Sequence, residues 1–83
     1  MKFGTITRGD RKIYILLTAS CPEGATLVAE SVAHGGNAVP ALICEKDTSK
    51  GEYVLILPLL YVDQTVRVRV IDAGGGVVDE ASQ

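Results

Sequence analysis

Tryptophan is absent from this chain of 83 residues, and the other aromatic side chains are scarce, with one phenylalanine and three tyrosines. Aromatic rings usually supply much of the buried area of a protein core. Here the core must instead be built from valine, isoleucine, leucine and alanine. A chain this short forms one domain with a single small core, which leaves little room for a deep active site.

Histidine and cysteine, which carry much of enzyme and metal chemistry, are also rare. The chain has one histidine, His34, and two cysteines, Cys21 and Cys44. A metal site needs three or four ligands, and the two cysteines lack the close spacing of a zinc site. A Cys–His nucleophile pair has no evident third group to orient the histidine. We therefore predict no catalytic, cofactor-binding or metal-binding residues, and we expect free thiols rather than a disulfide.

Neither sign of charge is concentrated in one part of the chain. Lysine and arginine number 8, aspartate and glutamate number 10, and the formal net charge is −2. Binding to the phosphate backbone of a nucleic acid requires a clustered basic face, so we predict no nucleic-acid partner. No Asp-x-Asp sequence occurs, which argues against a calcium site.

Long apolar runs are also missing. The longest, Tyr53 to Val62, has ten residues and contains Pro58. A helix that spans a membrane needs about 20 apolar residues, so no membrane span is expected. No apolar segment follows Lys2, so the sequence does not predict a signal peptide, and the expected location is cytoplasmic. A missing signal would also fit an internal fragment of a longer protein.

What the chain does contain is a series of apolar segments separated by turn residues at intervals of about 8–12 residues. This pattern is typical of a β-sandwich or a β-barrel. A weak helix competes with a strand over residues 23–33, but Thr26, Val28 and Val32 are β-branched and favour the strand. The expected strands are residues 2–8, 11–19, 26–33, 38–46, 52–57, 65–72 and 77–80.

The strands differ in their expected burial. Residues 13–17 are a continuous apolar run, which indicates burial on both sides or a strand central in its sheet. In residues 65–72, three valines alternate with Arg67 and Arg69, so we expect one buried face and one wet face. Pro40 lacks a backbone donor, which predicts that its strand lies at a sheet edge or contains a bulge.

Glycine-containing turns join the predicted strands. Gly9-Asp10 suits a tight hairpin. The run Gly74-Gly75-Gly76 predicts a second hairpin and not a phosphate loop, because valines follow it instead of Lys-Ser/Thr. The resulting fold class is all-β, a seven-stranded antiparallel sandwich over residues 1–80 with a disordered tail at 81–83. A five-stranded barrel with a long loop is the alternative.

Two segments near the C-terminus carry a family resemblance, Gly51 to Leu59 (GEYVLILPL) and Thr65 to Gly74 (TVRVRVIDAG). They resemble the last strands of bacterial immunoglobulin-like modules, in which Gly-x-Tyr/Phe opens a strand and Asp-Ala-x-Gly lies at the final hairpin. The Leu-Pro-Leu run is also similar to the small sandwich that precedes the catalytic part of some bacterial glycosyltransferases of cell-envelope polysaccharide synthesis. The resemblance implies that the seven-stranded sandwich is immunoglobulin-like. It also implies an accessory module of a larger bacterial protein, with the catalytic residues outside it. The core tryptophan and the cysteine pair of antibody domains are absent, so immune recognition is not implied.

The segment from Leu57 to Val62 is more apolar than an ordinary connection between strands. One interpretation is a loop folded over the end of the core. The other is a contact surface, because exposed apolar patches usually mark partner sites. Its residues would be Leu57, Leu59, Leu60, Tyr61 and Val62.

These observations lead to a hypothesis of a non-catalytic accessory module that acts through domain or protein contacts. Its partner would be the rest of the parent chain, another protein or a second copy in a homodimer. One alternative is a carbohydrate-binding sandwich, for which Tyr14, Tyr53 and Tyr61 would have to supply the aromatic platform. A small enzyme ranks last.

Overall fold

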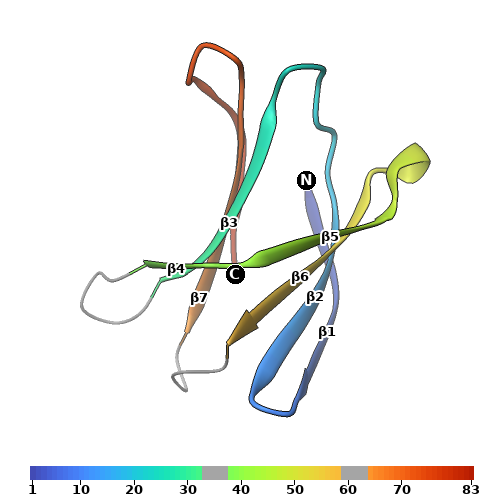
Figure 1. Cartoon of the computed structure of the whole chain (residues 1–83), viewed down its shortest axis with the longest axis vertical. Helices are drawn as coiled ribbons and strands as arrows, with labels where there is room; N and C mark the ends of the chain where they lie inside the picture. The colour runs from blue at the N-terminus through green and yellow to red at the C-terminus, as the bar shows by residue number, and fades with distance from the viewer. Residues whose placement is uncertain (33–37, 59–63) are drawn as a thin grey trace.

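The computed structural model describes residues 1–32, 38–58 and 64–83, and this part of the chain contains eight strands and one short 3₁₀ helix, η1 (Thr48–Lys50). The strands are β1 (Lys2–Gly9), β2 (Lys12–Thr18), β3 (Thr26–Val32), β4 (Ala38–Pro40), β5 (Leu42–Asp47), β6 (Glu52–Pro58), β7 (Thr65–Ile71) and β8 (Val77–Ser82). They form two four-stranded sheets in which every pair is antiparallel (Figure 1). Sheet A has the order β1-β2-β6-β5, and sheet B has the order β4-β3-β7-β8.

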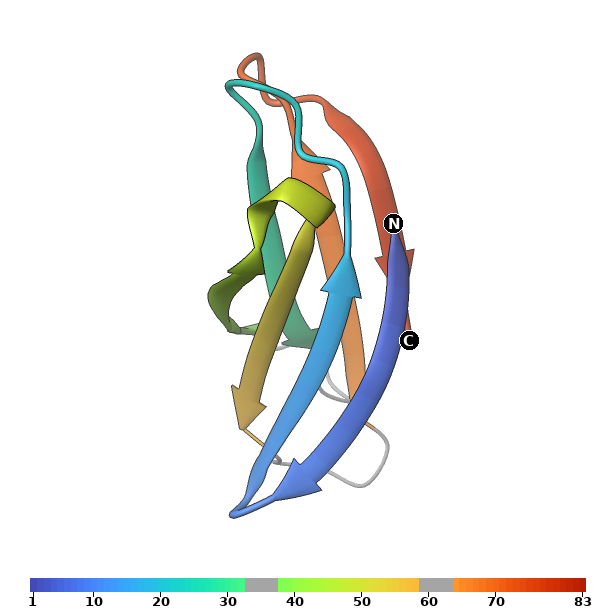
Figure 2. The ribbon, with the colours of Figure 1, turned by 90° about the vertical axis from the view of Figure 1, so that its right-hand side faces the viewer.

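The two sheets form a sandwich-like arrangement, so the predicted all-β class is confirmed. In Figure 2, β1, β2 and β6 of sheet A lie in front of the strands of sheet B. Alternate residues of the inner strands point between the sheets and are buried, as the period of two requires. The buried apolar side chains of this core are Ile13, Ile15, Leu17, Ala19, Ala29, Leu55, Leu57, Val66, Val68 and Val70.

The described residues contain eight strands instead of the predicted seven, because the segment predicted at 38–46 divides at Ala41. Its first part, β4, pairs with β3 in sheet B, and its second part, β5, pairs with β6 in sheet A. Pro40 has no backbone N–H to donate, whereas the N–H of Ala41 donates to the carbonyl oxygen of Ala29 at 2.9 Å. Both halves lie at sheet edges, which confirms the prediction made from Pro40.

The first hairpin turns one residue later than predicted. Gly9 pairs with Lys12, so the turn residues are Asp10 and Arg11, with φ values of 52° and 61°. A two-residue hairpin of this kind needs positive φ at both central positions, because its twist must match that of the strands. Asp10 tolerates this conformation better than Arg11 does.

The last strand also extends beyond its predicted end at residue 80. β8 continues to Ser82, and the backbone N–H and C=O of Gln83 both bond to Val66 at 2.9 Å. Pairing with β7 therefore continues over the residues predicted to be a disordered tail. Residues 81–83 pair with β7 through their backbone N–H and C=O groups, and the identity of their side chains does not predict such pairing.

Candidate functional site

Sheet A carries apolar side chains on both of its faces, although only the inner face belongs to the core. Along β2, and along β6 from Val54 onward, buried residues alternate with half-buried ones. The half-buried positions point away from sheet B, since successive side chains of a strand point to opposite faces. Six apolar side chains share this outer face of sheet A: Tyr14, Leu16, Leu42, Cys44, Val54 and Ile56. Charged side chains lie at its ends and edges, those of Lys2, Lys12, Lys46 and Glu52.

Strand register places these six side chains in two rows. In one row Leu42 pairs with Ile56, which pairs with Tyr14 on its other side. In the other row Cys44 pairs with Val54, which pairs with Leu16. Directly paired residues have Cβ atoms about 4.5–5.5 Å apart, so the rows form one contiguous apolar patch.

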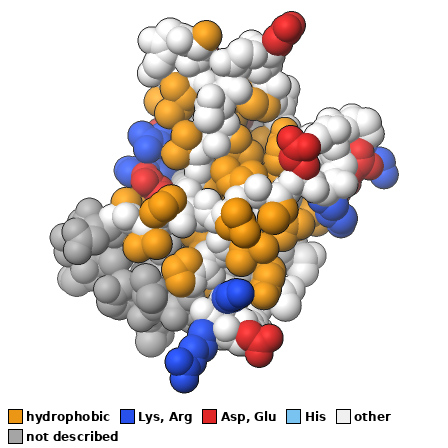
Figure 3. Space-filling model, viewed as in Figure 1, with side chains coloured by type: hydrophobic (Ala, Val, Ile, Leu, Met, Phe, Trp, Pro, Cys, Tyr) orange, Lys and Arg blue, Asp and Glu red, His pale blue; other side chains and the backbone are white. Residues whose placement is uncertain are grey.

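The patch extends to the edge of the sandwich. Leu42 is 62% exposed, the largest value among the exposed large hydrophobic residues in the described part of the chain. Beside it lies a groove of about 480 Å³, lined by β4, by the ends of β5 and β6, and by the first hairpin turn. Figure 3 shows hydrophobic side chains gathered over β5 and β6 on this side. The groove continues the apolar surface around the edge of sheet A.

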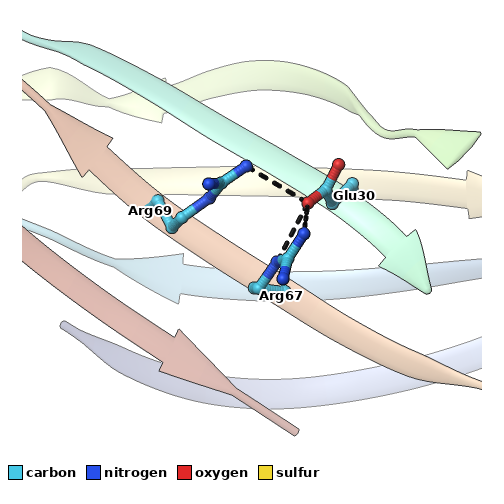
Figure 4. Close-up of polar contacts among 3 residues, drawn as sticks. All are labelled: Glu30, Arg67 and Arg69. Atoms are coloured by element: carbon cyan, nitrogen blue, oxygen red, sulfur yellow. Dashed lines mark hydrogen bonds and ion pairs between the residues drawn. The ribbon is translucent and has the colours of Figure 1, made fainter. Parts of the chain in front are cut away.

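The outer face of sheet B is different, because charged side chains occupy its centre. Glu30 of β3 pairs directly with Arg67 of β7. Its Oε1 accepts hydrogen bonds from Nε of Arg67 at 2.9 Å, from Nη2 of Arg67, and from Nη2 of Arg69 at 3.2 Å (Figure 4). The hydrogen bond to Glu30, with its negative charge, raises the pKa of Arg67. Both arginines lie on the outward face, as the alternation with valine predicts.

The glycine turn between β7 and β8 is the predicted hairpin. Oδ1 of Asp72 accepts hydrogen bonds from the N–H groups of Gly74 at 3.0 Å and Gly76 at 2.8 Å. These two backbone donors are thus already bonded to a carboxylate of the same turn. A bound phosphate would have to displace that carboxylate.

The cysteines are free thiols, as predicted. Sγ of Cys21 donates to the carbonyl oxygen of Ala25 at 3.5 Å, and Cys44 lies on the outer face of sheet A. In the parts of the chain that the structure describes, no three His, Cys, Asp or Glu residues come together as metal ligands would. His34 lies outside those parts, so its pairing with either thiol stays untested.

A polar depression of about 400 Å³ lies at the end of the sandwich next to η1. Its lining includes Tyr53, Lys50 and the thiol of Cys21, together with serine and threonine hydroxyls. Among the described residues that line it there is no histidine, aspartate or glutamate. The hydroxyl of Ser49, one of these lining residues, donates to Oδ1 of Asp47 at 2.6 Å as part of the cap of η1.

The contact surface predicted from the sequence lies mostly outside the described residues. Leu57 is described, and its side chain has no exposed surface and packs in the core. Residues 59–62 lie outside the described residues, and their role as a contact surface stays a prediction. The outer face of sheet A was not predicted, although the continuous apolar runs 13–17 and 53–57 signal two apolar faces.

Comparisons with known proteins give no matching family model, no matching curated protein and no matching solved structure. The described residues also include no helix with the length and apolarity that crossing a membrane requires.

Proposed function

We propose that this chain is a non-catalytic, immunoglobulin-like accessory module that acts through domain or protein contacts made by the outer face of sheet A. The strand orders support the immunoglobulin-like assignment. Constant-type immunoglobulin domains place strands A, B, E and D in one sheet and strands C, F and G in the other. If β4 is counted as an extra strand beside β3, the order β1-β2-β6-β5 corresponds to strands A, B, E and D. The order β3-β7-β8 then corresponds to strands C, F and G.

The observation that carries the contact role is the apolar outer face of sheet A. An antiparallel sheet with one solvated face usually alternates apolar and polar residues. Here β2 places Tyr14 and Leu16 outward, and β6 places Val54 and Ile56 outward. A contiguous exposed apolar patch is typical of a surface that another protein covers. The charged face of sheet B gives no such indication.

The parent protein that we propose is a larger bacterial protein, with a cell-envelope glycosyltransferase as the specific candidate. This part of the proposal rests on the resemblance of the segments 51–59 and 65–74. Catalysis would then reside in another domain, and this module would position it through contacts.

A carbohydrate-binding role is the weaker candidate. Sugar rings are commonly stacked on neighbouring exposed aromatic side chains. Tyr53 pairs with Leu17 on the inward side of sheet A and packs against the core, whereas Tyr14 lies on the outer face. The tyrosines in the described parts of the chain therefore do not form a shared platform.

Carbene footprinting tests the proposed contact. Labelling of Tyr14, Leu42 and Ile56 is compared between this chain and the product of its complete reading frame. We expect labelling of these side chains to fall in the complete protein, while Val78, which is 52% exposed on β8, serves as a control on sheet B. Equal labelling of the outer face of sheet A in both proteins would contradict a contact within the parent.

A further inference from the structure

We draw no further inference here: the strongest candidate, the apolar outer face of sheet A together with the groove of about 480 Å³ beside Leu42, carries none because nothing in the described part of the structure shows what covers it.

Discussion

At the scale of single residues, backbone conformation places the largest demands on this sequence. Arg11 and Gly51 both adopt positive φ, at 61° and 67°. Glycine enters this region without steric cost, whereas a residue with a Cβ atom pays about 1–2 kcal/mol. Gly51 is therefore suited to its backbone conformation, whereas Arg11 is not.

Replacing Arg11 with glycine should stabilise the protein. The substitution removes the strain of the left-handed conformation and creates the Asp-Gly pair that two-residue hairpins favour. Greater freedom of the unfolded chain offsets part of the gain, so we expect a net increase of about 0.5–1 kcal/mol, or about 3–6 °C in Tm. Calorimetry measures the change. Arg11→Ala is the control, because it removes the same charge but keeps the strain, and an alanine variant that melts above the glycine variant would contradict this account.

Replacing Gly51 with alanine should have the opposite effect. A Cβ atom at this position would overlap the carbonyl oxygen of Ala19, and that segment is held by a bond from the N–H of Ala19 to the oxygen of Gly51 at 2.9 Å. We expect a loss of at least about 2 kcal/mol in urea unfolding. Gly75→Ala is the matched control, because Gly75 also has positive φ but has no atom within 4 Å of a Cβ. Equal losses in the two variants would show that the overlap has no effect.

At the scale of elements, short polar side chains stabilise the turns, whereas apolar side chains stabilise the packing of the strands. Asp47 caps η1, and its Oδ1 accepts from the backbone N–H of Ser49 at 3.1 Å and from its hydroxyl at 2.6 Å. Asp72 does the same for the last hairpin through the N–H groups of Gly74 and Gly76. In both turns an aspartate supplies acceptors for donors that the strands cannot satisfy.

The cap at Asp47 should make stability depend on pH in the acid range. Its hydrogen bond with the Ser49 side chain lowers the pKa of Asp47 below the ordinary value of 3.8. Because the folded pKa is the lower one, the stabilisation is complete above the unfolded pKa and is lost as the pH falls through the folded pKa. The difference in urea stability between the natural sequence and Asp47→Asn should therefore be constant near neutral pH and shrink below pH 3.8. The cap would be contradicted if this difference in urea stability did not change with pH. It would also be contradicted if the difference were the same when Ser49→Ala is present in both proteins.

Strand positions were largely predictable, because the period of two is a direct consequence of strand geometry. The alternation of valine with Arg67 and Arg69 correctly predicts which face of β7 is buried. The division at Ala41 was not predictable, since it depends on a bond to Ala29 that is distant in sequence. The outer face of sheet A was missed for a related reason. A continuous apolar run indicates two apolar faces, but only the fold decides whether a second layer covers both.

At the scale of the whole molecule, one core joins the two sheets and must stabilise both. Val68 has no exposed surface and lies in the same cluster as Leu55 and Leu57 of the opposite sheet. Any loss of packing at this point therefore weakens the contact between the sheets and not a single strand. No disulfide or described metal cluster reinforces that contact.

Replacing Val68 with aspartate should unfold the protein. A buried charge without a partner costs well over about 4 kcal/mol, which is comparable to the whole stability of a small domain. Circular dichroism and amide NMR dispersion measure the loss. Thr65→Asp, at an exposed position of the same strand, is the control and should keep the fold. An unchanged melting temperature for Val68→Asp would contradict the inward position of this side chain.

The difference between the two outer faces also bears on how far an assembly through sheet A could proceed. A partner on the outer face of sheet A leaves the outer face of sheet B uncovered, with the Glu30–Arg67–Arg69 cluster at its centre. That cluster places charge where the centre of sheet A has apolar side chains, so the same contact is not available a second time on sheet B. A sandwich with two apolar outer faces could stack without end into fibres, whereas a single apolar outer face gives a closed unit.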